Sequence, residues 1–394
     1  MDKILNPYAP GAGTPPPELA GRDEIRSTVN TCIARLKRGY SNKSILMVGL
    51  RGVGKTVLLE RMRQDVETEG VHTIRIEVPE DRSLPAVLAP KLRVALIRLS
   101  KLEAAKDAAT RALAALAGFI GSLKVSYKDL DLNIDTSSIP GLADNGDLES
   151  DLTDLFETIG NAARKANTVL AIFVDEMQYI KEKEFGALIA ALHRCSQDRL
   201  PITVVGAGLP QLLARAGNAK SYAERLFEFP MIGPLDKEAA IRAITKPAKD
   251  NDVNFDEKAV EFILDKTKGY PYFLQEWGKH TWDIADKSPI TLEDAENATD
   301  TALASLDESF FRVRLDRLTP KEKDYMRAMA ELGPGPHRSG DIADCLHKKV
   351  TSLGPTRSNL TSKGMVWSPS HGDTAFTVPL FDEFMRRTIP EMPS

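Results

Sequence analysis

A stretch of eight residues has the composition of a phosphate-binding loop. It reads Gly49-Leu50-Arg51-Gly52-Val53-Gly54-Lys55-Thr56 and matches the pattern GxxxxGK[ST]. Its glycines allow consecutive backbone N–H groups to turn toward phosphate oxygens, and the lysine ammonium neutralises phosphate charge. The hydroxyl of Thr56 is a ligand of the kind that Mg²⁺ takes in such loops. The sequence therefore predicts that residues 49–57, ending at Val57, bind ATP with Mg²⁺.

Two adjacent carboxylates, Asp175 and Glu176, follow the apolar run at 168–174. Ligands of open α/β sheets bind at the carboxyl ends of the strands, so an acidic pair there is placed for chemistry. We expect Asp175 to hold Mg²⁺ through water and Glu176 to polarise the water that attacks the γ-phosphate. Acids after a strand are also common N-caps of a following helix. For Gln178, two residues on, we expect an exposed position on a helix.

The segments around both motifs have the hydrophobic patterns that would position them. Short apolar runs predict buried strands, and apolar residues at helical spacing predict helices between them. The predicted strands are 44–48, 72–78, 168–176 and 201–208, and the predicted helices are 23–37, 57–67, 86–121 (one or two), 152–166 and 185–197. A strand or hairpin is also expected at 123–135. Alternating strands and helices indicate a doubly wound parallel α/β sheet.

Changes in pattern along the chain divide it into four parts. Residues 1–17 form a Pro-rich arm that we expect to run extended over the surface. The α/β domain is predicted at 18–235, and helical periodicity at 236–305, broken at Pro247, Gly269–Pro271 and Pro289, predicts a helical lid. Residues 306–394 are predicted to be a separate small domain.

Composition excludes several classes of function. The formal net charge of −4 gives no global attraction to nucleic acid or to anionic membranes. The chain has three widely spaced cysteines, too few and too far apart for a disulfide framework. It shows no cationic start followed by an apolar run, and no apolar stretch long enough to span a bilayer. We therefore expect a cytoplasmic protein without membrane partners.

Together these motifs resemble those of the AAA+ ATPases, specifically the archaeal and bacterial group related to origin-recognition initiators and to STAND regulators. The segment 18–24 is similar to the GRxxE box of that group, which implies that Arg22 lies against adenine. At the position of the family's sensor 1 residue, 206–210 reads Gly-Ala-Gly-Leu-Pro and offers no polar side chain. That departure leaves water positioning to backbone groups or to Thr203.

The same resemblance implies two further contacts with nucleotide. The segment 221–227 resembles the one in which AAA+ proteins carry an arginine finger, which points to Arg225, with Arg215 as the alternative. A finger acting on a neighbour's γ-phosphate would require a homo-oligomer. Gly269 and Pro271 resemble the GxP motif by which the lid touches nucleotide. Because no sensor 2 arginine is found, we expect lid closure through packing rather than charge.

The C-terminal segment has the element order of a winged helix-turn-helix. Helices are predicted at 319–331, 339–346 and 352–363, followed by a two-strand wing at 365–378. Such a third helix would enter the major groove of DNA and present Arg357, Ser358, Asn359 and Thr361. From Leu318 onward, however, ten basic residues face nine acidic ones, which is not the basic footprint of a DNA-binding domain.

Two functions therefore remain open from the sequence. The first is an ATPase that couples ATP binding and hydrolysis to assembly on duplex DNA. The second is a STAND-like switch in which ATP/ADP exchange exposes the winged-helix domain to a regulatory protein, with slow turnover. The adjacent acids favour turnover, whereas the absent sensor 1 residue and the nearly neutral C-terminal domain favour the switch.

Overall fold

A parallel five-stranded sheet forms the centre of the computed structural model, which describes residues 1–11, 13–124, 127, 129 and 137–392. The strand order is β2-β3-β4-β1-β5, with all neighbours parallel. The strands are β1 (Ser44–Val48), β2 (His72–Glu77), β3 (Leu170–Asp175), β4 (Ile202–Gly208) and β5 (Phe227–Glu228). The doubly wound α/β prediction is confirmed. The two-residue strand β5 was not predicted, because it is too short to show a pattern.

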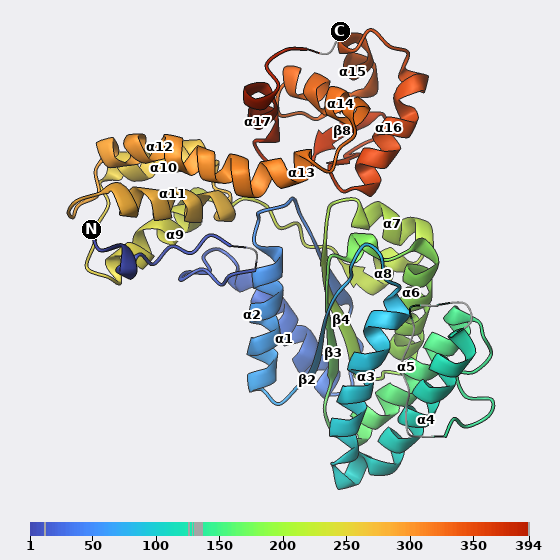
Figure 1. Cartoon of the computed structure of the whole chain (residues 1–394). Helices are drawn as coiled ribbons and strands as arrows, with labels where there is room; N and C mark the ends of the chain where they lie inside the picture. The colour runs from blue at the N-terminus through green and yellow to red at the C-terminus, as the bar shows by residue number, and fades with distance from the viewer. Residues whose placement is uncertain (12, 125–126, 128, 130–136, 393–394) are drawn as a thin grey trace.

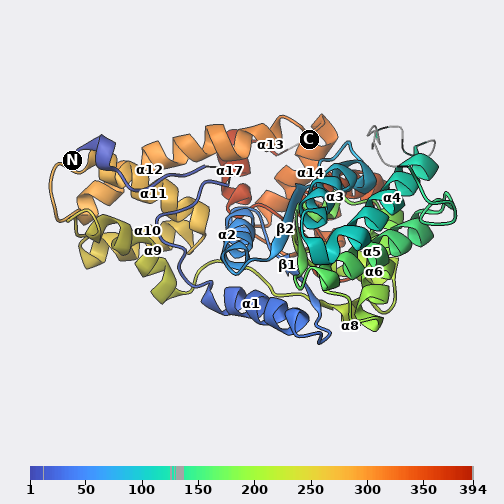
Figure 2. The same cartoon turned by 90° about the horizontal axis from the view of Figure 1, so that it is seen from below.

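Helices cover both faces of this sheet, as Figure 2 shows from below. One face packs against α1 (Asp23–Lys37) and α2 (Lys55–Thr68). The other packs against α3 (Leu84–Ser100), α5 (Leu148–Lys165) and α6 (Glu182–Gln197), with α4 (Lys106–Leu123) adding to the same core. Every residue of β1, β3 and β4 is buried, which explains why these strands read as continuous apolar runs. The strand or hairpin expected at 123–135 falls largely outside the described residues.

Strand register brings the two sequence motifs to the same edge of the sheet. Val48, the last residue of β1, pairs with Gly208, and Asp175 of β3 pairs with Glu77. All four strands run in the same direction, so the loop after β1 and the acids after β3 lie at their common carboxyl edge. Short helices α7 (Leu212–Ala219) and α8 (Ala223–Leu226) connect β4 to β5.

A helical lid lies beside this edge (Figure 1). The chain enters the lid after β5, and the N-terminal arm also contacts it. It consists of α9 (Lys237–Lys249), α10 (Glu257–Thr267), α11 (Pro271–Ile284) and α12 (Leu292–Leu306). The break expected at Pro247 is wrong, because this proline lies within the last turn of α9. The breaks expected at Gly269–Pro271 and at Pro289 do fall between helices.

The C-terminal part has the arrangement of a winged helix-turn-helix. Helices α14 (Pro320–Glu331), α15 (Ser339–Cys345) and α16 (Val350–Ser362) are followed by the wing strands β7 (Val366–Trp367) and β8 (Asp373–Phe376) and by α17 (Phe381–Thr388). The two-residue strand β6 (His337–Arg338) completes an antiparallel sheet of order β6-β8-β7. A capping box at Thr319 starts α14, as sequence periodicity and Pro320 indicated.

One continuous rod joins the lid to this domain. Helix α12 passes directly into a π-helical segment, Asp307–Arg312, and then into α13 (Val313–Leu315) without a loop. The predicted domain limit at residue 306 coincides with the start of the π-helical segment. The four domain ranges themselves stay predictions. Among the described residues, no helix has both the length and the apolarity needed to cross a membrane.

The N-terminal arm is anchored in the lid rather than lying freely on the surface. The ring of Tyr8 is buried, packs edge-on against Phe255 and Trp282, and donates a hydrogen bond to the carbonyl of Ile244. Gly278 permits this approach, because a Cβ there would lie 2.6 Å from the ring of Tyr8. The expectation of a purely surface arm is therefore wrong at Tyr8.

Replacing Tyr8 by alanine should detach the arm from the lid. Loss of a buried aromatic ring is expected to lower the free energy of unfolding by about 3 kcal/mol. Tyr8→Phe, which removes only the hydroxyl, should cost about 1 kcal/mol. Denaturant unfolding measures both, with the exposed Tyr40→Ala as control; equal stability of Tyr8→Ala and native protein would contradict the anchoring.

Candidate nucleotide-binding site

The loop predicted to bind phosphate has the backbone geometry that this task requires. It leaves β1 at Gly49, where a Cβ would lie 2.1 Å from the carbonyl oxygen of Ile232, so only glycine fits. Gly54 adopts a φ of 85° immediately before α2 begins at Lys55. A helix N-terminus directs free N–H groups and a positive dipole end toward the loop. The loop is therefore shaped to receive an anion.

The ammonium of Lys55 is buried and is held by its own loop. Its Nζ donates to the carbonyl oxygens of Gly49 at 2.9 Å and of Leu50 at 2.8 Å. Burial lowers the pKa of Lys55 to about 8, and the negative charge of Glu176 opposes this shift. A buried cation gains strongly from an anionic ligand, so phosphate binding would stabilise the charged form of Lys55.

Asp175 and Thr56 meet beside this lysine. Asp175 is buried, which raises the pKa of its carboxyl group, while a hydrogen bond from the hydroxyl of Thr56 opposes the shift. The Glu176 N–H donates to Oδ1 of Asp175 at 2.9 Å, and Glu176 adopts a left-handed φ of 54°. Such a conformation is unfavourable for a residue other than glycine and is concentrated at functional sites. The predicted metal pair, Asp175 and Thr56, is thus brought together.

Gln178 is buried, which corrects the expectation of an exposed helix position. Its amide nitrogen donates to Oε2 of Glu176, and its amide oxygen accepts from the N–H of Leu209 at 3.1 Å. Gln178 therefore ties Glu176 to the end of β4, the strand where the family's sensor 1 residue would stand. An amide that joins two elements could have been inferred only from their spatial proximity.

Thr203 does not take part in this site. It lies near the start of β4, pairs in register with Ala171, and shares a hydrogen bond of 3.1 Å with the hydroxyl of Ser44. The end of β4 at Gly208 lies five residues further along, roughly 16 Å at the rise of an extended strand. The prediction that Thr203 positions the attacking water is therefore wrong.

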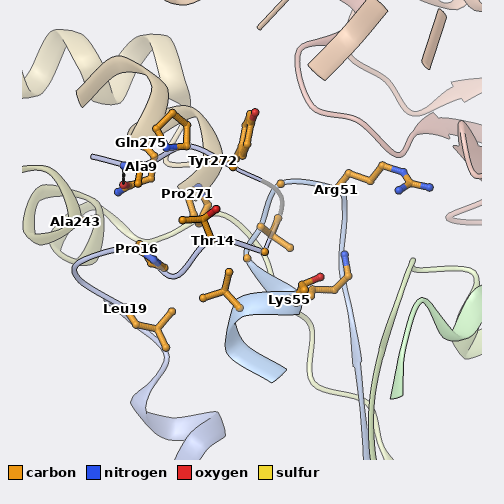
Figure 3. A pocket seen from close by; sticks show the side chains of 18 of the residues that line it. Ala9, Thr14, Pro16, Leu19, Arg51, Lys55, Ala243, Pro271, Tyr272 and Gln275 are labelled. Carbon is orange, nitrogen blue, oxygen red and sulfur yellow. Dashed lines mark hydrogen bonds between the residues drawn. The ribbon is translucent and has the colours of Figure 1, made fainter. Parts of the chain in front are cut away.

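A pocket of about 320 Å³ extends from the loop toward the lid and the arm (Figure 3). Its loop end is lined by Arg51 to Val57 and Glu176, and its far end is lined mostly by apolar groups of the arm and lid. The far-end residues include Ala9, Pro16, Leu19, Ala243, Pro271 and Gln275. Phosphates at the loop would therefore place a nucleobase in the apolar end.

Of the residues expected to contact nucleotide outside the loop, Arg22 and Pro271 line this pocket, whereas Gly269 does not. Arg22 donates to the carbonyl oxygens of Gly233 at 2.6 Å and of Val53 at 3.3 Å, so it braces the loop against the segment that leads into the lid. Burial lowers the pKa of Arg22. The carbonyl of Gly269 instead accepts a hydrogen bond from Leu235 at 2.9 Å.

Two lid-side residues in the pocket were absent from the sequence-based predictions. The N–H of Tyr272 donates to the carbonyl of Gly52 at 3.2 Å, and the Tyr272 ring stacks on Phe310 with 4.8 Å between centroids. Arg314 of α13 also lines the pocket. Arg314 lies outside the four lid helices, so the expectation that lid closure uses packing rather than charge stays a prediction. No local motif marks Arg314, which lies beyond the last lid helix.

The two arginine-finger candidates occupy different surroundings. Arg215 donates to the carbonyl oxygens of Gln178 and Ile180, and burial lowers its pKa, so it holds its own chain together. Arg225 is exposed on α8, just before Phe227, which pairs with Ser44 at the start of β1. Arg225 thus lies at the opposite edge of the sheet from the phosphate loop. A role for it as a finger in a neighbouring subunit stays a prediction.

The C-terminal part of the chain touches the phosphate loop directly. The N–H of Arg51 donates to the carbonyl of Thr377 at 2.9 Å, and the Arg51 guanidinium donates to the hydroxyl of Tyr179 at 3.2 Å. Figure 3 shows the Arg51 side chain extending away from the pocket toward the C-terminal strands. Glu80 accepts hydrogen bonds from Tyr179 and, at 2.7 Å, from Arg317. The loop and the C-terminal domain therefore share one hydrogen-bond network.

The four residues predicted to contact DNA are not all available. Arg357 donates to Ser368 at 2.5 Å and to the carbonyl of Asp373 at 2.6 Å, so it fastens α16 to the wing. Ser358 and Asn359 are exposed, and Thr361 is half-buried with its hydroxyl bonded to the carbonyl of Arg357. The exposed pair is uncharged, which offers no electrostatic attraction to phosphate backbones.

The residues present fit a magnesium nucleotide. Nε of Arg51 is buried without a hydrogen-bond partner, and Arg314 forms no ion pair with any described residue, so the loop end of the pocket holds a guanidinium that lacks an anion. Phosphate oxygens suit such guanidinium groups. Thr56 and Asp175 supply the hydroxyl and carboxylate oxygens that Mg²⁺ prefers.

Comparisons with known proteins agree with this geometry. Residues 18–205 match the AAA ATPase domain family, and residues 308–385 match a family described only as a domain of unknown function. The chain is 23% identical over 367 residues to an uncharacterised HTH-type transcriptional regulator of Methanocaldococcus jannaschii, covering 90% of this chain and 84% of that protein. The fold of this chain is similar to that of a Walker-type ATPase of Pyrococcus abyssi, with a TM-score of 0.59 and 17% identity. The match covers 97% of this chain and 99% of the P. abyssi chain.

Gln178→Glu should slow ATP turnover without weakening ATP binding. The substituted carboxylate can still accept from Leu209 but cannot donate to Glu176, and Gln178 does not line the pocket. We expect the turnover number to fall by about tenfold to a hundredfold while KM changes little. Steady-state kinetics measures both, with exposed Gln64→Glu on α2 as the matched control. A change confined to KM would contradict a positioning role for Gln178.

Nucleotide affinity should decrease as the pH rises above about 8. The free protein loses the Lys55 proton near that pH, whereas bound phosphates hold the proton in place. Binding at higher pH must therefore take up a proton, and affinity should fall by up to about tenfold per pH unit. Titration calorimetry in two buffers of different ionisation enthalpy would detect the uptake. Affinity independent of pH from 7 to 9.5 would contradict this prediction.

Proposed function

We propose that this chain, whose residues 18–205 form an AAA-type ATPase domain, hydrolyses Mg-ATP and uses its nucleotide state to control the docking of its winged-helix domain. One observation carries the proposal. The N–H of Arg51, a member of the phosphate-binding loop, donates to the carbonyl of Thr377 in the C-terminal domain. Backbone N–H groups of such loops are phosphate ligands. A nucleotide and the winged-helix domain would therefore compete for the same loop.

The residues of the site divide the chemistry among them. Lys55 and the loop N–H groups hold the phosphates, and Thr56 with Asp175 would hold Mg²⁺, which supplies charge neutralisation at the phosphates when bound. Glu176 lines the pocket and, held by Gln178, orients and polarises the attacking water. Its fixed position compensates for the absence of a polar side chain at the end of β4.

The hydrogen-bond network links this chemistry to the C-terminal domain. Tyr179, in the 3₁₀ turn after Glu176, accepts from Arg51 and donates to Glu80, which in turn binds Arg317. A terminal phosphate that draws Arg51 toward itself would break this chain at its first link. Hydrolysis would restore it, which resets the docked state.

A regulatory protein is the partner that the C-terminal surface favours. Several of its cations are neutralised internally, because Lys363 binds Glu322, Arg386 binds Asp382 and Arg387 binds Asp307. Duplex DNA is the second candidate. It is supported by the HTH-type regulator of M. jannaschii and by the exposed Ser358 and Asn359 on α16. Assembly into a homo-oligomer through Arg225 is compatible with either partner, the regulatory protein or duplex DNA.

Small-angle scattering in different nucleotide states tests the docking. We expect a non-hydrolysable ATP analogue to expand the particle relative to the nucleotide-free protein, and ADP to leave it compact. Arg317→Glu, which places like charges at Glu80, should expand it without nucleotide, whereas exposed Arg312→Glu should not. Identical scattering in all nucleotide states would defeat the proposal.

ATP turnover with and without duplex DNA separates the two partners. Native protein should hydrolyse ATP, and Glu176→Gln should lose about a hundredfold or more of that rate. Stimulation of the native rate by DNA, absent in Glu176→Gln, would support the DNA candidate. Rates unchanged by DNA in both proteins would defeat it and leave the protein-controlled switch.

A further inference from the structure

Arg314 lines the pocket, and its guanidinium is held against Phe310 on the preceding helical turn. Its guanidinium lies 4.2 Å from the centre of the Phe310 ring and donates to the Phe310 carbonyl. Burial lowers the pKa of Arg314 to about 10, and the nearby charge of Arg51 adds to this effect. Both contacts fix the guanidinium, and neither supplies a negative charge.

The charges around Arg314 favour an anionic ligand. The pocket is lined by Arg22, Arg51, Lys55 and Arg314 on the positive side and by Glu18 and Glu176 on the negative side. Glu18 binds Arg242 outside the pocket. Carboxylates outside the pocket lining act on the other cations, namely Asp236 on Arg22, Asp175 on Lys55 and Glu80 on Arg51, whereas the acid that acts on Arg314 is Glu176. No described carboxylate forms an ion pair with Arg314. Arg314 is half-buried, and withdrawing an unpaired charge from water is costly, so an anion at this position would be stabilised.

The neighbours of Arg314 identify which part of the ligand it faces. The charged and polar groups that act on its pKa are Arg51, Tyr272, Glu176 and Tyr179. Arg51 and Glu176 line the loop end of the pocket, and the N–H of Tyr272 is bound to Gly52 of the same loop. The apolar end, where a nucleobase fits, is lined by other residues such as Leu19 and Ala243. Glu176 is the group that would act at the terminal phosphate. Arg314 is therefore placed on the side of that phosphate.

We infer that Arg314 binds the terminal phosphate of a bound nucleoside triphosphate and passes its presence to the winged-helix domain. The inference rests on the proposed function and assigns its sensing step to one side chain. A guanidinium suits this step, because its planar fork binds two phosphate oxygens at once. A diphosphate leaves Arg314 without that ligand, so the two nucleotides are distinguished.

The position of Arg314 on the rod explains how the signal is passed on. Arg317, three residues later, binds Glu80 and anchors the C-terminal domain to the ATPase domain. Phe311, three residues earlier, stacks on Phe384 of α17 with 5.0 Å between centroids. Movement of Arg314 toward a phosphate would therefore shift both contacts. The sensing residue and the docking contacts lie within seven consecutive residues, 311–317.

Binding of ATP analogue and ADP to Arg314→Met tests the inference. This variant keeps an unbranched side chain over Phe310 but removes the charge. We expect affinity for the non-hydrolysable ATP analogue to fall by roughly tenfold to a hundredfold, and affinity for ADP to change by less than about twofold. Arg314→Lys, a point charge without the fork, should lie between. Exposed Arg312→Met on the same rod is the control and should match native protein.

The outcomes distinguish this inference from the proposed function. Equal loss of ATP and ADP affinity in Arg314→Met, or no loss of either, would overturn the inference and assign Arg314 a structural role. Lys55→Ala should lose both nucleotides; if it binds them as native protein does, the proposed function fails instead. Scattering adds a readout independent of turnover, because Arg314→Met should stay compact with the ATP analogue where native protein expands.

Discussion

Two adjacent residues of the phosphate loop hold this structure together. The N–H of Arg51 is bound by the C-terminal domain through Thr377, and the carbonyl of Gly52 is bound by the lid through Tyr272. Buried backbone groups require partners, so the loop cannot change shape while both neighbours keep their present contacts. The ATPase core, lid and winged-helix domain are thereby tied to one short turn.

The pKa shifts in the site arise because its charged groups are withdrawn from water while no anion is bound to them. Lys55 and Arg314 are half-buried cations whose pKa values are lowered, and Asp175 is a buried acid whose pKa is raised. Each shift means that the charged form is destabilised in the absence of a ligand. Functional sites commonly hold such groups, because the ligand then restores what burial removed. The free protein is in this sense prepared for a polyanion with a metal ion.

Local patterns in the sequence predicted the elements and motifs well, and long-range contacts explain the failures. The loop residues 49–56 and the acids at 175–176 are contiguous, and strands β1, β3 and β4 are buried throughout and mostly apolar, so periodicity and spacing sufficed. Gln178 is polar in a polar context, and only its position between Glu176 and Leu209 reveals its role. Arg314 resembles any surface arginine until the rod places it in the pocket. Thr203 was misplaced because a strand pattern does not say which end faces the site.

The π-helical segment within the rod has a mechanical consequence. A π-helical turn holds one more residue than an α-helical turn, so the segment stores surplus chain between lid and C-terminal domain. Each residue rewound from π to α geometry would turn everything beyond it by roughly 20° around the helix axis, because an α-helical residue turns the chain by about 100° and a π-helical residue by about 80°. A small axial rewinding could thus swivel the whole winged helix and present a different face to its surroundings, with no hinge loop required.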